Sequence, residues 1–216
     1  MGIFNRSSTL PEYWNAYVKT FDKHLPKLFQ ELTFVVLDTE TTGFDKTEDR
    51  ILSIGALKLK NNLIHVDDVF DVYIEQKKFN EKSIAIHGIL NNSKRDCISE
   101  ELAIQKFLEY VGNNVVVAHH AGFDIGMINS ALKRLGLPKL KNKSLDTGVL
   151  YKQTLIKSYL VQPQEHYSLD DLAEKYSISK KDRHTALGDA YITALAFVKI
   201  LSKIKEKKVL SLKNLR

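Results

Sequence analysis

The sequence predicts an α/β domain in which a five-stranded mixed sheet is flanked by helices. Two apolar runs, at 34–37 and 115–118, have the length and composition of strands buried on both faces. Segments with apolar residues at helical spacing follow at 124–135 and 185–205. A helical pattern over 99–111 separates the two strands, so they are expected to lie parallel in one sheet.

The same periodicities place the other elements in order. Strands near 33–39, 51–60 and 66–75 should form an antiparallel meander, with Asn61 and Asn62 in the turn between the second and third. Ser99 is expected to cap a helix that ends near Val111, and Gly136 to end the helix at 124–135. The remaining expected elements are a short strand near Ser144 and Leu145 and helices at 147–157, 168–176 (capped by Ser168) and 185–205.

The chain divides into a helical extension at 1–31, a main domain at 32–205 and a basic tail at 206–216. Tyr13, Trp14, Tyr17 and Phe21 recur at helical spacing between Pro11 and about His24. One interpretation packs this aromatic stripe on the chain's own domain. The other makes it a docking helix for a partner subunit or for self-association, because an unpaired stripe would leave a large apolar patch exposed.

Charge and cysteine content narrow the class of protein. The 216 residues include 32 basic and 26 acidic side chains, a formal net charge of +6, which suits a polyanionic partner. Lys180, Lys181 and Arg183 are candidates for phosphate contacts. A single cysteine, Cys97, excludes an intrachain disulfide and suits a reducing compartment. No apolar run approaches a membrane span and no signal-peptide stretch begins the chain, so a cytoplasmic protein without membrane contact is expected.

Two carboxylates, Asp38 and Glu40, stand where the first apolar run ends. Side chains at i and i+2 of a strand point the same way, so both project together from an interior strand. Two anions at this spacing repel each other and resist burial, so they need a compensating cation, of which a divalent metal ion is the simplest. The alternative is that one of them caps the turn after the strand.

Three further polar residues are expected at the same site. Asp124 follows the second apolar run, at the edge of the buried face of its helix. Asp189 precedes Ile192 at three residues and Ala196 at seven, so it too faces the core. His184, five residues before Asp189, can face the same site only from a loop that enters the helix.

These residues resemble a known family. The patterns Asp38-x-Glu40, His-x-Ala-x-Phe-Asp ending at Asp124, and His184-x-Ala-x-x-Asp189 resemble the three motifs of the DEDDh branch of the DnaQ-like 3′-to-5′ exonucleases. The chain is most similar to the proofreading epsilon subunit of bacterial DNA polymerase III. The resemblance covers 32–200, and three short motifs in the correct order and spacing make it specific.

The resemblance implies a ribonuclease H-like fold and metal-dependent hydrolysis of phosphodiester bonds. Asp38, Glu40 and Asp189 would hold the metal ion that binds the attacking water, and Asp38 would bridge to a second ion positioned by Asp124. His184 would be the general base, because histidine titrates near neutral pH. The ions would be two Mg²⁺, for which Mn²⁺ can substitute. Zinc is disfavoured, because this donor set is rich in carboxylates and lacks cysteine.

The resemblance also implies contacts to the substrate. Thr41 and Thr42 would meet the terminal 3′-OH, and Phe44 and Phe123 would stack on the last bases, although core packing is an equally good interpretation of either phenylalanine. The nucleotide pocket would be lined by Ile86, His87 and His120. The family usually has asparagine where this chain has His120, which puts only the substrate contact near that position in doubt.

The implied function is removal of nucleoside 5′-monophosphates from the 3′ end of DNA, in proofreading or repair. The expected partner is nucleic acid with a free 3′ end, single-stranded DNA first, with a polymerase subunit as a further partner. Trimming of RNA 3′ ends is the alternative within the enzyme class. A catalytically silent, polymerase-associated binding module is the alternative outside it, and it is disfavoured because all five motif positions are present.

Overall fold

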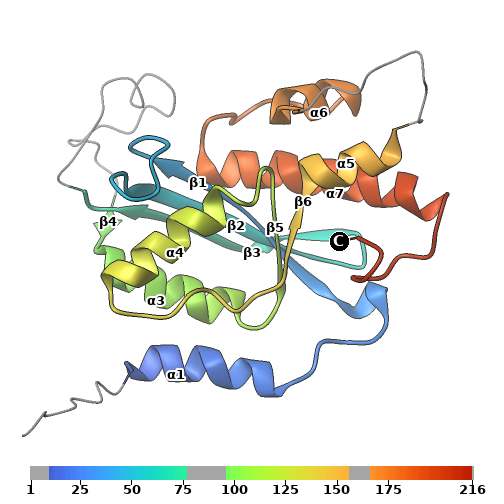
Figure 1. Cartoon of the computed structure of the whole chain (residues 1–216). Helices are drawn as coiled ribbons and strands as arrows, with labels where there is room; N and C mark the ends of the chain where they lie inside the picture. The colour runs from blue at the N-terminus through green and yellow to red at the C-terminus, as the bar shows by residue number, and fades with distance from the viewer. Residues whose placement is uncertain (1–9, 77–95, 156–165, 216) are drawn as a thin grey trace, which may run out of the picture.

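The computed structural model describes residues 10–76, 96–155 and 166–215. One six-stranded sheet, in the order β4-β3-β2-β1-β5-β6, runs through the middle of the molecule with helices on both faces (Figure 1). The strands are β1 (Thr33–Thr41), β2 (Ile51–Lys60), β3 (Leu63–Ile74), β4 (Cys97–Ile98), β5 (Val115–Ala118) and β6 (Ser144–Asp146). The helices are α1 (Glu12–Lys19), α3 (Glu100–Val111), α4 (Asp124–Arg134), α5 (Thr147–Thr154), α6 (Leu169–Lys175) and α7 (Ala186–Lys205), with 3-10 turns at Thr20–Asp22 and Phe29–Glu31.

The mixed α/β class is confirmed, but the predicted count of five strands is wrong. The additional strand, β4, has two residues and pairs in parallel with the end of β3, through Tyr73 with Cys97 and Ile74 with Ile98. Two residues have no periodicity to detect, so only their partner strand defines them. The antiparallel meander of β1, β2 and β3 is confirmed, as is the parallel pairing of β1 with β5.

The predicted turns and caps have clear local causes. Asn61 and Asn62 both have positive φ, 49° and 62°, which is the backbone of a two-residue hairpin turn that asparagine tolerates well. Gly136 has φ 70° and follows α4; its N–H bonds the carbonyl of Lys133, and the next N–H bonds that of Leu132, as in a Schellman motif. Ser168 begins α6 with a reciprocal capping box to Asp171.

The two faces of the sheet bury separate cores because strand side chains alternate. Val35 and Leu37 of β1 face α1, α3 and α4. Phe34 and Val36, one residue out of step, face α5 and α7. Figure 1 shows the same division, with α5, α6 and α7 on one side of the sheet and α1, α3 and α4 on the other. Asp38 and Glu40 keep the register of Phe34 and Val36, so they point toward the α7 side.

Helix α1 packs on the chain's own domain, which agrees with the packed interpretation. Trp14 and Tyr17 are each 2% exposed within the core that contains α3. The Tyr17 hydroxyl donates to Asn142 Oδ1 at 2.6 Å and accepts from the Lys141 backbone N–H at 2.8 Å. At the other end of the chain Leu215 is buried in the second core. The division into three segments stays a prediction.

Among the described residues, no helix is both long and apolar enough to cross a membrane.

Candidate active site

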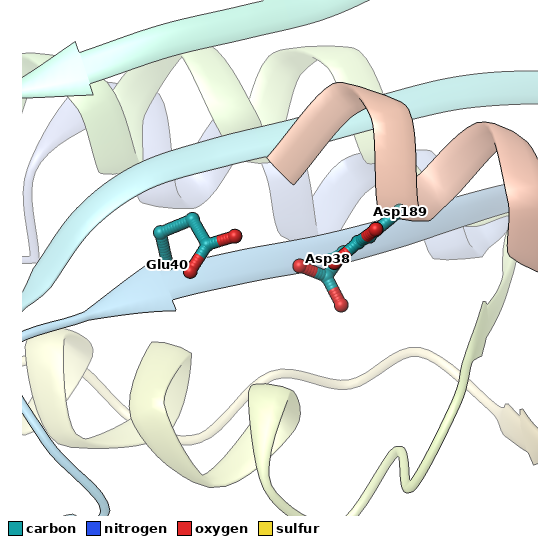
Figure 2. A group of neighbouring side chains, drawn as sticks. All are labelled: Asp38, Glu40 and Asp189. Atoms are coloured by element: carbon teal, nitrogen blue, oxygen red, sulfur yellow. The ribbon is translucent and has the colours of Figure 1, made fainter. Parts of the chain in front are cut away.

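Three carboxylates lie close together near the C-terminal end of β1. Asp38 and Glu40 lie on β1 and Asp189 lies in the first turn of α7 (Figure 2). Each offers a ligand oxygen, and these oxygens all lie within 4.8 Å of one another. Asp189 is 4% exposed, and Asp38 and Glu40 are half-buried. Asp38, Glu40 and Asp189 are called the acidic triad below.

Helix α7 reaches the acidic triad because β2 has a glycine at the point of contact. Gly55 pairs with Asp38 in the antiparallel register. A Cβ atom at Gly55 would lie 2.1 Å from the backbone nitrogen of Leu187, so only glycine lets the first turn of α7 rest directly on the sheet. The Thr185 side chain caps the helix by accepting from the Gly188 N–H at 3.1 Å. Asp189 is thereby held beside Asp38.

Asp124 approaches β1 from the other face of the sheet. Pairing of β1 with β5 ends at Val36 and Val117, before the chain reaches Thr39. Asp124 Oδ1 accepts from the backbone N–H of Thr39 at 3.0 Å and from the Thr39 hydroxyl at 2.7 Å. Asp124 is 3% exposed and lies outside the 4.8 Å group. Three of the four predicted metal ligands thus lie close together. The fourth, Asp124, is hydrogen-bonded to Thr39, which lies between Asp38 and Glu40 on β1.

The acidic triad carries negative charge that the fold does not fully compensate. Burial, followed by repulsion from Asp124, Asp189 and Glu40, raises the pKa of Asp38 well above its ordinary value. Burial and then Asp189 raise the pKa of Glu40 to about 7. Burial raises the pKa of Asp124 to about 7 against the Thr39 hydrogen bonds. A cation bound between these carboxyl groups would favour their ionised form and offset the repulsion between them.

The donor set fits a hard divalent cation. It consists of carboxylate oxygens, which Mg²⁺ and Mn²⁺ prefer, and their closeness would be costly without positive charge between them. The acidic triad could therefore hold a metal ion.

Arg183 was predicted from the sequence as a phosphate contact. In the structure its positive charge lies beside Asp189 of the acidic triad. Its Nη1 atom donates to Asp189 Oδ2, and its Nε atom donates to Asp170 Oδ1 at 3.1 Å. It opposes burial by lowering the pKa of Asp189, which still lies above its ordinary value. A basic residue six positions before a predicted inward-facing acid was the signal available in the sequence.

His184 lies in the loop that enters α7, as predicted. Its side chain is exposed and its φ is 65°. Its backbone N–H donates to Asp189 Oδ1 at 3.3 Å. The loop therefore ties the position of His184 to a member of the acidic triad.

Two predicted substrate contacts, Thr41 at the end of β1 and Thr42 directly after it, have different hydrogen-bond partners. The Thr41 hydroxyl donates to the carbonyl of Gly43 at 2.7 Å. Thr42 is fully buried, and its hydroxyl donates to Asp49 Oδ1 and accepts from the Arg50 N–H. The side chain of Thr42 therefore organises the loop after β1.

Two aromatic rings meet beside this loop. Phe44 is 82% exposed, and its ring centroid lies 5.7 Å from that of Phe123 at the start of α4. Lys46 donates to the carbonyl of Gly122 at 2.8 Å and so ties the loop to the turn before α4. The exposed Phe44 ring is available to another molecule, whereas Phe123 is half-buried.

Two neighbouring histidines follow β5 and have different surroundings. His119 is 9% exposed, and its two ring nitrogens contact Thr147 Oγ1 and the carbonyl of Tyr167, both at 2.9 Å. Burial lowers its pKa to about 4. His120 is exposed with φ 57°, a conformation in which asparagine is enriched. Ile86 and His87, the other predicted pocket residues, lie outside the described residues.

Comparison with known proteins agrees with this geometry. The exonuclease family model (RNase_T) matches residues 35–197, which include every carboxylate described above. The chain belongs to the exonuclease family. The family predicted from the three motifs is thus confirmed.

Curated relatives of this exonuclease-family chain include much longer polymerases. DNA polymerase III PolC-type of Caldanaerobacter subterraneus subsp. tengcongensis is 37% identical over 174 residues, which is 80% of this chain and 12% of the relative. The Thermotoga petrophila protein of the same name is 33% identical over 191 residues, or 87% of this chain and 13% of the relative. The chain therefore spans about an eighth of the length of these relatives.

Solved structures support the ribonuclease H-like exonuclease fold. Exonuclease X in complex with 5′ overhanging duplex DNA superposes with a TM-score of 0.63 at 22% identity, covering 85% of this chain and 96% of that one. E. coli exonuclease I in complex with a dT13 oligonucleotide gives a TM-score of 0.69 at 15% identity, covering 82% and 42%.

Proposed function

We propose that this chain is a divalent-metal-dependent 3′-to-5′ exodeoxyribonuclease that releases nucleoside 5′-monophosphates from a DNA 3′ end. The observation that carries the proposal is the acidic triad, whose three oxygens lie within 4.8 Å of one another inside the segment matched by the exonuclease family. The match to the exonuclease family supports nuclease activity in general. The direction, the DNA substrate and the ligand roles are the proposal.

In the proposal Asp38, Glu40 and Asp189 would hold one Mg²⁺, and Asp38 and Asp124 would help to hold a second. Two such ions, when bound, lower the pKa of the attacking water and neutralise charge that develops on the scissile phosphate. Asp124 contributes through its fixed orientation, because two hydrogen bonds from Thr39 leave it little freedom. The hydroxyl of Thr39 thus acts on the site through Asp124.

His184 is proposed as the general base that accepts the proton of the attacking water. The entry loop supports this role, because it places an exposed imidazole directly before the helix that carries Asp189. The Phe44 ring is proposed to stack on the terminal base, since base stacking on an aromatic face tolerates any sequence. Phe123, His120, Thr41, Ile86 and His87 stay proposed substrate contacts, and Thr42 is proposed to act through its backbone.

The identities of the relatives and structural neighbours support DNA as substrate. The relatives are DNA polymerases III, and the structural neighbours are described in complex with duplex DNA or an oligonucleotide. A function beside a polymerase, in proofreading or repair, and a cytoplasmic location are therefore proposed with the activity.

The test is digestion of 5′-labelled oligonucleotides of one sequence, as single-stranded DNA, duplex DNA and RNA, with Mg²⁺, Mn²⁺ or EDTA. A ladder that shortens from the 3′ end, with release of 5′-monophosphates, is expected on single-stranded DNA with either ion. An oligonucleotide whose 3′ end is blocked by an inverted nucleotide should resist. Asp38→Asn, which keeps the shape of the side chain and removes its charge, should abolish the ladder.

Three outcomes would contradict the proposal. Faster shortening of RNA than of DNA would make the chain an RNA-trimming enzyme. Cleavage of the blocked oligonucleotide would indicate an endonuclease. No cleavage by wild type of any substrate with either ion would favour a silent binding module.

A further inference from the structure

The Arg183 guanidinium links α6 to α7 at the edge of the acidic triad. It donates to Asp189 Oδ2 from one nitrogen and to Asp170 Oδ1 of α6 from another, the latter at 3.1 Å. The side chain of Arg183 is 20% exposed and that of Asp189 6% exposed. This ion pair is largely shielded from water, unlike exposed ion pairs, which contribute little to stability.

The positive charge of Arg183 acts on the whole acidic triad. It lowers the pKa of Asp38, Glu40 and Asp189, against the burial that raises each of them. Arginine stays protonated at any working pH, so the positive charge of Arg183 is always present beside the acidic triad.

Arg183 is also bonded to Asp189, one of the residues that would hold a metal ion. Oδ2 of Asp189 accepts from Arg183, and Oδ1 accepts from the His184 N–H at 3.3 Å. Both oxygens of this carboxylate are therefore engaged. A cation that takes Asp189 as a ligand would share one of these oxygens with a hydrogen bond, and its charge would repel the guanidinium beside it.

We propose that Arg183 is the resident counter-ion of the acidic triad in the metal-free protein, and that a divalent cation binds by displacing it from Asp189. This inference rests on the proposed function, in which the acidic triad is the metal site. Arg183 then stabilises the folded protein before metal arrives and lowers the affinity for metal. Replacing Arg183 should therefore lower the stability of the metal-free protein and raise its affinity for metal. General damage to the fold would not produce this combination.

The test compares Arg183→Gln with Arg134→Gln. Arg134 is a matched control, because it forms a similarly half-buried ion pair, with Glu100, between α3 and α4 on the other face of the sheet. Binding of Mn²⁺ alone is measured by titration calorimetry without nucleic acid, and thermal melting is recorded in EDTA. Neither measurement requires activity.

Arg183→Gln should melt several degrees lower in EDTA and bind Mn²⁺ about tenfold more tightly than wild type, because one adjacent positive charge is removed. Arg134→Gln should lose stability without a change in the Mn²⁺ dissociation constant. Arg183→Lys keeps the charge but loses the two-nitrogen fork, so its Mn²⁺ affinity should lie between those of wild type and Arg183→Gln.

Equal or weaker Mn²⁺ binding by Arg183→Gln, with normal binding by wild type, would overturn the displacement and leave the proposed function intact. Failure of folded wild type to bind Mn²⁺ would overturn the metal site itself, and the displacement with it. The two failures are therefore distinguishable in one titration series.

Discussion

Replacing Glu40 with glutamine should stabilise the metal-free protein at pH 8 and have little effect at pH 4. In the folded protein, burial and Asp189 raise the pKa of Glu40 to about 7, from an ordinary value of 4.5. The folded state thus holds the proton more tightly than the unfolded state. Glu40 therefore favours folding most below pH 4.5, and this contribution is lost as the pH rises through about 7.

The difference between the two pKa values sets the size of the effect. From about 7 to 4.5 it corresponds to at most about 3 kcal/mol of unfolding free energy above pH 7. Glu40 is half-buried, so solvent screening reduces this to roughly 1–2 kcal/mol. For a chain of this size the melting temperature should rise by about 3–6 °C at pH 8.

The assay is thermal unfolding in EDTA at pH 4 and pH 8, with Glu109→Gln, an exposed site on α3, as the control. Adding Mn²⁺ should reverse the order at pH 8, because the metal stabilises wild type through a ligand that Glu40→Gln lacks. An equal gain at both pH values would show that packing, and not ionisation, is responsible. A less stable Glu40→Gln protein at pH 8 in EDTA would refute the uncompensated charge.

Three other changes test separate parts of the structure. His184→Gln should lower the single-turnover rate constant by roughly 10² or more, measured across pH, and leave the Mn²⁺ affinity unchanged. An unchanged rate and pH profile would assign the general base to another residue. Trp14→Ala should lower the unfolding free energy by roughly 3–5 kcal/mol in denaturant titration, because Trp14 is 2% exposed, and wild-type stability would exclude the packed helix. Gly55→Ala should weaken Mn²⁺ binding and activity together in a folded protein, because the new Cβ pushes α7 and Asp189 from the sheet; unchanged Mn²⁺ affinity would mean that the helix start tolerates the shift.

Features that depend on local periodicity could be predicted from the amino-acid sequence. A repeat of two residues along β1 puts Asp38 and Glu40 on one side of the strand, whatever the strand later packs against. A helical repeat puts Asp189 on the core side of α7 and leaves His184 in the loop before it. These relations hold within one element, so neighbouring residues are enough to predict them.

The way in which separate elements meet at the site depends on packing between residues that are far apart in the sequence. Gly55 on β2 allows the first turn of α7 to rest against the sheet, and this contact joins residues more than a hundred positions apart. The pairing of β1 with β5 ends before Thr39, and Asp124 accepts from the Thr39 N–H and stays outside the acidic triad. The contact of Arg183 with Asp189 also depends on packing. A buried carboxylate without a compensating charge is costly, and Asp189 becomes buried only when the sheet and its helices have packed together.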